Sequence, residues 1–145
     1  MRSMTKFIPL IIILTLFSCT AEQSPINYGK DACHFCKMNI VDKQHAAEIV
    51  TKKGKAFKYD AIECMMRDIM ERDEDNIALF LMTDYSSPGK LVDATKAIYL
   101  ISENLPSPMG ANLTGFEIKA TAEETQKEKS GILYSWDELK KVFVK

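Results

Sequence analysis

The stretch "QHAAEIVTKKGKAFKYDAIECMMRDIMERD", residues 44–73, contains the change in hydrophobic spacing that decides the fold. Residues 44–52 and 56–60 have the composition of two short strands, and the glycine turn "KKGK" between them predicts a β-hairpin. The apolar side chains then follow helical spacing, at positions i, i+3, i+4, i+7 and i+8: Ile62, Met65, Met66, Ile69 and Met70. The sequence therefore predicts two strands followed by an amphipathic helix over residues 60–73.

The start of this helix carries a further signal. Asp60 is the predicted N-cap and Glu63 stands at position N3, which is the pattern of a capping box. On a helical wheel Cys64 lies beside Asp60, Arg67 and Glu71, away from the apolar stripe. We therefore expect Cys64 to pack against another element or to face a cleft. The methionines of the stripe and of the following strand are expected to be packing residues: Met65, Met66, Met70 and Met82.

The rest of the chain predicts further strands and helices. Residues 76–84 form an apolar run, which predicts a strand buried on both faces. Residues 91–102 and 116–120 are also predicted strands, and the second is half-exposed because apolar and charged residues alternate along it. Residues 122–131 are polar throughout and predict a solvated helix or a loop. Residues 135–143 predict a last helix that begins at a capping box. This mixture indicates an α+β fold.

The N-terminus has the pattern of an export signal. A basic start is followed by the apolar residues 7–17 and then by Cys19, which directly follows a small residue. This pattern predicts a lipoprotein signal peptide over residues 1–18, with Cys19 as the acylated N-terminus of the mature chain. Residues 19–30 are polar and predict a tether. We therefore expect an exported, lipid-anchored protein of the cell envelope, with its domain in the periplasm.

Charge and cysteine content exclude some functions. The formal net charge is −1, and no cluster of Lys and Arg indicates nucleic-acid binding. Apart from Cys19, the chain has three cysteines: Cys33, Cys36 and Cys64. An odd number in an exported chain argues against a pure disulfide framework and leaves at least one thiol reduced or bound to a metal.

The segment "DACHFCKM", residues 31–38, holds the Cys33/Cys36 pair. A haem tether requires His directly after the second cysteine, but Lys37 stands there. A zinc site usually needs a second cysteine pair, which this sequence lacks. A thioredoxin-like motif usually follows a strand and opens a helix, whereas this one comes directly after the tether. A structural disulfide, a redox pair and a soft-metal site remain open.

Two methionines favour the metal site. Met38 adds a thioether to the two thiols, and such soft sulfur donors select Cu(I) over hard cations. Met109 lies in "PSPMGA", where two prolines and a glycine predict a stiff loop, so its side chain either covers the core or is presented as a ligand. His34, between the two thiols, could bind a metal or lower a thiol pKa, whereas His45 is expected to be structural or exposed.

The segments "CHFCKM", "FKYDAIECM", "VDATKAIYL" and "SPMG", in this order, resemble the NosL family of periplasmic copper-binding lipoproteins that are encoded with nitrous oxide reductase. The resemblance extends from about Cys33 to Phe116. His34 and Lys37 depart from the pattern, because members often have Pro and Gly around the cysteines, but the sulfur positions are intact.

The resemblance implies a Cu(I) chaperone that supplies the copper–sulfide cluster of nitrous oxide reductase. The implied partners are the reductase and its membrane-associated ABC-type maturation complex with a periplasmic subunit. The implied copper ligands are Cys33, Cys36, Met38 and Met109, with His34 and Cys64 as possible additional ones. Nothing in the pattern supplies a catalytic residue, so we do not expect an enzyme. The alternative is a thiol–disulfide redox lipoprotein that uses Cys33 and Cys36.

The resemblance also implies two similar β-β-α-β halves, although no repeat is visible in the sequence. We assign residues 31–85 to the first half, with the CxxCxM site, and residues 86–145 to the second, with the Pro-Met-Gly loop. The expected fold is α+β with mixed or antiparallel sheets and with helices packed on one face.

Overall fold

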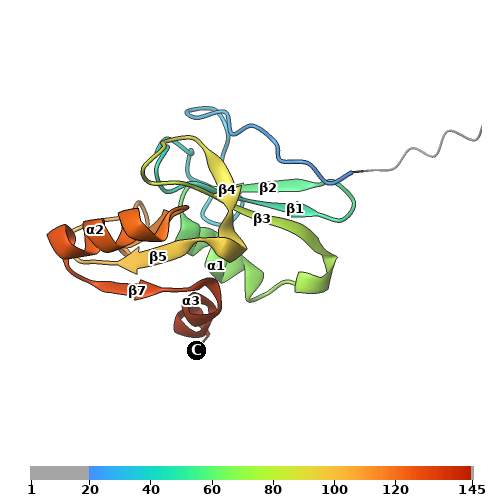
Figure 1. Cartoon of the computed structure of the whole chain (residues 1–145). Coiled ribbons are helices and arrows are strands. Elements are labelled where there is room, and N and C mark those ends of the chain that lie inside the picture. Colours follow the sequence, from blue (N-terminus) through green and yellow to red (C-terminus); the bar gives the residue numbers. More distant parts are fainter. Residues whose placement is uncertain (1–19, 145) are drawn as a thin grey trace, which may run out of the picture.

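The computed structural model describes residues 20–144 and contains two antiparallel sheets and three α-helices (Figure 1). This architecture confirms the predicted α+β class. The predicted signal peptide and Cys19 lie outside the described residues. Within residues 20–144, every helix is too short or too polar to span a membrane.

The first sheet has four strands in the order β2-β1-β3-β4, and β1 pairs antiparallel with both β2 and β3. The hairpin between β1 and β2 turns at Gly54, whose φ of +81° favours glycine. The elements that form and connect this sheet are β1 (Ala47–Thr51), β2 (Ala56–Tyr59), α1 (Ile62–Ile69), the 3₁₀ turn η1 (Glu74–Asn76), β3 (Ile77–Thr83) and β4 (Leu91–Asp93). β4 joins this first sheet, although it follows residue 85, where the predicted first half ends.

The second sheet repeats this arrangement with three strands in the order β6-β5-β7, and β5 pairs antiparallel with both neighbours. Its elements are the 3₁₀ turn η2 (Ala94–Lys96), β5 (Ile98–Ile101), β6 (Leu113–Phe116), α2 (Lys119–Lys129), β7 (Ile132–Tyr134) and α3 (Trp136–Phe143). In each half the first strand is central, and a helix connects the second strand to the third.

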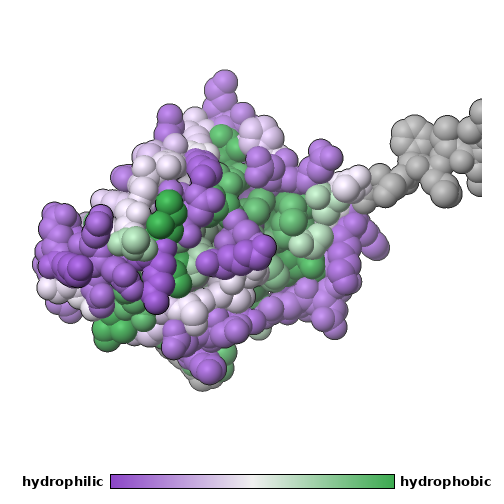
Figure 2. All heavy atoms as spheres, viewed as in Figure 1, coloured by the Kyte–Doolittle hydropathy of each residue, from purple (hydrophilic) through white to green (hydrophobic). Residues whose placement is uncertain are grey.

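Helix α1 lies between the two sheets and contacts β1 and β2 of the first and β6 of the second (Figure 1). The main core therefore joins both halves, with Ile62 and Met82 from one and Tyr99 and Leu113 from the other. A smaller core packs α2 against its sheet through residues such as Leu100 and Ala122. Hydrophilic side chains gather over α2 (Figure 2).

The predicted capping box at the start of α1 is wrong. The N-cap is Ala61, which makes no side-chain capping hydrogen bond, and the helix ends at Ile69 rather than at residue 73. Asp60 and Glu63 are both buried, and their carboxylates accept hydrogen bonds from Cys36 and from the Met109 loop respectively. The packing prediction holds for Met65, Met66 and Met82 but not for Met70, which is 36% exposed.

Three strand predictions also need correction. The predicted strand 91–102 is broken, because the Asp93 carboxylate accepts from the Thr95 amide and caps a 3₁₀ turn between β4 and β5. The predicted strand 116–120 is misplaced, since β6 ends at Phe116 and α2 begins at Lys119. β3 is buried throughout only in its second half, and β7 was not predicted at all. The C-terminal capping box of Ser135 and Glu138 is confirmed.

Candidate metal centre

The segment that contains the Cys33/Cys36 pair is a turn held by backbone hydrogen bonds. Ala32 and Asn39 form an isolated antiparallel bridge, and the Cys33 amide donates to the Met38 carbonyl at 2.8 Å. The Lys37 amide donates to the Cys33 carbonyl at 3.0 Å, and Lys37 takes a left-handed φ of +67° to close the turn. Gly is the usual residue for such a backbone, so Lys37 adds local strain.

The turn brings its two thiols against the junction of β2 and α1. One ligand atom from each of Cys33, Cys36, Asp60 and Cys64 lies within 4.8 Å of the others. The Cys36 thiol donates to Asp60 Oδ1 at 3.3 Å. Cys33 and Cys64 are almost completely buried, whereas Cys36 is half-buried. We call these four residues the thiol cluster; its three cysteines are free thiols in this structure.

The three thiols of the thiol cluster differ in pKa. The hydrogen bond with Cys64 lowers the pKa of the Cys33 thiol to about 6, although burial alone would raise it. The same bond, followed by burial, raises the pKa of Cys64 well above its usual range. Burial raises the pKa of the Cys36 thiol to about 11. Cys33 is therefore the thiol of the cluster that most readily gives a thiolate, which is the form that binds metals.

The methionines and histidines of the predicted site lie in different surroundings. Met38 is 55% exposed at the end of the turn, whereas Met109 is half-buried and packs against the core cluster that contains Cys33 and Cys64. The His34 ring lies outside the thiol cluster and stacks edge-on against Phe57, with 4.5 Å between ring centroids. His45 is buried and structural, with hydrogen bonds to Asp42 and Thr114.

Sequence reasoning missed Asp60 as a member of the site. The sequence predicts Asp60 as a helix cap and places Cys64 on the polar side of the predicted wheel. Their spacing of four residues at the start of a helix places both side chains on one face, which was the available signal. On the polar side of the predicted wheel, Asp60 and Cys64 are buried against the Cys33/Cys36 turn, whereas Arg67 and Glu71 are exposed.

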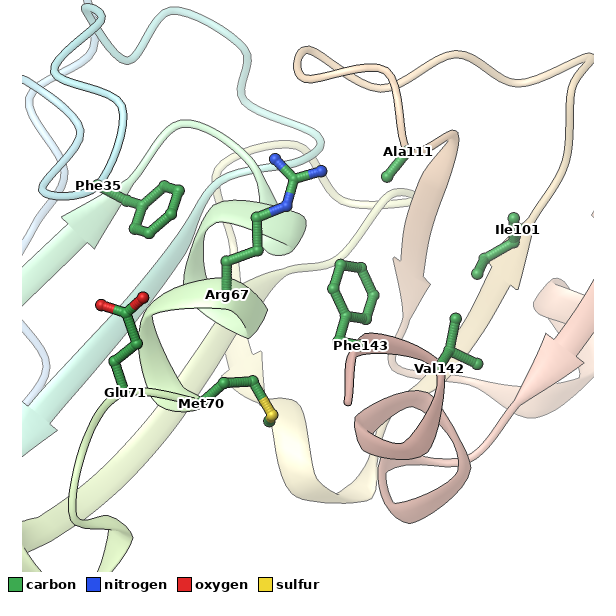
Figure 3. Close-up of a pocket in the computed structure, with 8 residues that line it drawn as sticks. All are labelled: Phe35, Arg67, Met70, Glu71, Ile101, Ala111, Val142 and Phe143. Carbon is green, nitrogen blue, oxygen red and sulfur yellow. The ribbon is translucent and has the colours of Figure 1, made fainter. Parts of the chain in front are cut away.

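A largely apolar groove of about 620 Å³ adjoins this region. Figure 3 shows Arg67 of α1 between the rings of Phe35, from the Cys33/Cys36 turn, and Phe143 of α3. Ala111, from the loop that carries Met109, lines the same groove. The turn and the loop therefore border one surface depression.

A profile of the NosL family matches residues 26–144. This chain belongs to the NosL family. The match confirms the resemblance carried by the CxxCxM and Pro-Met-Gly segments. No curated protein sequence matches the chain significantly.

A solved structure of the copper chaperone NosL from Shewanella denitrificans has a similar fold, with a TM-score of 0.65. It is 21% identical to this NosL-family chain, and the comparison covers 82% of this chain and 96% of that one. At this identity the likeness establishes a shared fold over nearly the whole of the Shewanella protein.

Proposed function

We propose that this NosL-family chain is a Cu(I) chaperone whose thiol cluster holds one copper ion. The observation that carries the proposal is the convergence of three thiols, two from a turn and one from α1, within 4.8 Å. Thiolates and thioethers are soft donors that favour Cu(I). The similarity of fold to a protein described as a copper chaperone supports the same reading.

The difference in pKa among the three thiols favours the binding of a metal ion by the cluster. Cu(I) binds deprotonated thiols, and the lowered pKa of the Cys33 thiol favours its thiolate. Cys36 is the half-buried member, so copper enters and leaves on its side. Asp60 offers a hard oxygen, which is a poor ligand for Cu(I), and its hydrogen bond instead orients the Cys36 thiol.

The two methionines would complete the site from outside the cluster. Met38 is exposed and free to approach an incoming ion, whereas Met109 is held half-buried on its loop. His34, packed on Phe57, would assist only after its ring turned away. Release would then proceed by ligand exchange, with a partner's donor replacing the exposed thioether first.

We further propose that this copper is delivered to nitrous oxide reductase through its ABC-type maturation complex, as the resemblance of the sequence to the NosL family implies. The predicted lipid on Cys19 would confine the domain to the periplasmic side of a membrane and raise its effective concentration near such partners. A Cys19→Ser variant should leave the membrane fraction while keeping its copper affinity. Cells that lack the protein should accumulate reductase with less copper.

The copper proposal is tested by anaerobic titration of the purified protein against a Cu(I) chelator. We expect about one Cu(I) per chain and a loss of affinity of at least tenfold in Cys64→Ser, as is usual when metal-site residues are removed. Met70→Leu, which changes a partly exposed methionine at the C-cap of α1 outside the cluster, is the matched control and should bind like the wild type.

A thiol–disulfide redox function is the second candidate, because the lowered pKa of Cys33 is also typical of redox-active cysteines. Cys33 is only 1% exposed, which hides its sulfur from a protein disulfide. Disulfide reductase activity together with unchanged Cu(I) affinity in Cys64→Ser would reject the copper proposal in favour of this one.

A further inference from the structure

A buried glutamate connects α1 to the loop that carries Met109. Glu63 is fully buried in the first turn of α1, next to Cys64 in the chain. Its Oε1 accepts three hydrogen bonds from the loop: from Ser107 Oγ at 2.5 Å, from the Met109 amide at 3.2 Å and from the Ala111 amide at 3.4 Å. One oxygen atom therefore fixes three points of the loop, on both sides of the methionine.

The loop that carries Met109 depends on its hydrogen bonds to Glu63 for its shape. Within it, the Gly110 amide donates to the Ser107 carbonyl at 3.1 Å, and Ser107 Oγ also accepts from the Leu113 amide at 3.2 Å. Ser107 is thus both a donor to Glu63 and the residue that closes the loop onto β6. Without the carboxylate, the Ser107 hydroxyl and two loop amides would lose their acceptor inside the protein.

Glu63 affects the position of Met109, a proposed copper ligand, as well as the stability of the fold. The backbone amide of Met109 itself donates to Glu63, so the carboxylate fixes the backbone position from which the Met109 side chain extends. Met109 packs against the core cluster that contains Cys33 and Cys64. A single residue of α1 therefore relates the position of Met109 to that of the neighbouring Cys64 thiol.

We propose that Glu63 is a positioning residue for Cu(I) binding, which holds the Met109 thioether at the thiol cluster. This inference rests on the proposed function. It assigns Glu63 no direct contact with the metal. Residues that orient metal ligands typically change metal affinity by about 10- to 100-fold when they are removed.

The test is a double-mutant cycle on the Cu(I) affinity of the purified protein, with Glu63→Ala, Met109→Leu and the double variant. Leucine keeps the bulk of Met109 and removes its sulfur. We expect each single variant to bind Cu(I) about tenfold or more weakly, and the double variant to bind no more weakly than the weaker single variant. If Glu63→Ala does not fold, Ser107→Ala replaces it in the cycle, because it removes one loop donor to Glu63 and leaves the buried carboxylate in place.

Glu48→Ala is the matched control. Glu48 is also fully buried, on β1, and each of the two glutamates has an Oε2 without a hydrogen-bond partner among residues 20–144. Glu48 accepts instead from the Ser24 amide, away from the Met109 loop. We expect Glu48→Ala to be less stable but to bind Cu(I) like the wild type. Hydrogen exchange at the Met109 and Ala111 amides should accelerate in Glu63→Ala and stay slow in Glu48→Ala.

Two results would overturn the inference while leaving the proposed function intact: independent losses from Glu63→Ala and Met109→Leu that add up, or an equal loss of affinity in Glu48→Ala. Absence of Cu(I) binding by the wild-type protein would instead reject the proposed function, and the inference with it.

Discussion

The two halves of this protein share a topology but not a distribution of chemistry. Each has a central strand flanked by two antiparallel partners and a helix before the third strand. In the first half that helix, α1, is buried except at Arg67 and carries Cys64 and Glu63. In the second half the equivalent helix, α2, buries Ala122 and exposes most of its polar residues. The contrast indicates that the environment of a helix, rather than its place in the topology, determines what its residues can do.

The contrast is tested most strongly by removing a core side chain from α1. Ile62→Ala should lower the free energy of unfolding by about 2–5 kcal/mol, because Ile62 is fully buried between the two sheets. Glu124→Ala, on the exposed surface of α2, should change it by less than about 0.5 kcal/mol. Denaturant titration followed by circular dichroism measures both, and similar losses would mean that the two helices are equally embedded.

The contact between the halves is probed at Gly115 of β6. A Cβ atom there would lie 2.0 Å from the Met82 sulfur and 3.1 Å from Ile62 Cδ1, so Gly115→Ala should destabilise the fold by about 1–3 kcal/mol through overpacking. Gly54→Ala meets no atom within 4 Å and strains only its own φ of +81°, at about 1 kcal/mol. Thermal unfolding of the two variants separates the effects; a harmless Gly115→Ala would show that β6 and α1 pack more loosely than described.

Helix capping gives a smaller effect. Ser135→Ala removes the capping box of α3 and should cost about 1 kcal/mol of unfolding free energy. Ala61→Gly at the start of α1 removes no side-chain cap but deletes a fully buried methyl group, so it should cost about 1 kcal/mol through lost packing. Equilibrium unfolding in urea compares them, and an unchanged stability in Ala61→Gly would contradict the view that packing holds α1.

The smallest expected effect concerns ion pairs. The hydrogen bond from Lys58 lowers the pKa of the Asp31 carboxyl in the folded protein. The pair therefore contributes its full stability at pH values above the ordinary pKa of the carboxyl. This contribution is lost as the pH falls through the lowered pKa of the folded state. Asp31→Asn should therefore cost up to about 1 kcal/mol at pH 7 and nothing in strong acid. Glu117→Gln, in the exposed pair with Lys90, should be nearly neutral at both pH values. Urea titrations at pH 7 and in acid measure the difference.

The sequence predicted the first half more fully than the second, for physical reasons. The 44–73 stretch has local signals, namely strand composition, a glycine turn and helical spacing, and its elements formed close to the predicted places. The second half depends on non-local pairing: β7 is three residues long and exists because it joins the edge of β5. The break between β4 and β5 depends on which sheet each strand joins, which local spacing does not specify.

The candidate site shows the same limit. Cys33 and Cys36 are visible as a motif and Cys64 as an additional ligand, but Asp60 is recognised as a member of the thiol cluster only when β2 and α1 are placed against the turn. Asp60 and Glu63 look like capping residues because the sequence pattern of a capping box cannot show that both carboxylates are buried. Their roles come from tertiary contacts with Cys36 and with the Met109 loop.

The burial of α1 also has an evolutionary consequence. Cys64 and Glu63 are packed as tightly as Ile62, so a substitution that changes metal preference also changes the core. Most such changes lower stability, and proteins tolerate only a few before they fall below the threshold for folding. If the proposed function holds, a change in copper affinity is therefore more readily acquired at the exposed Met38, where a replacement leaves the packing of α1 untouched.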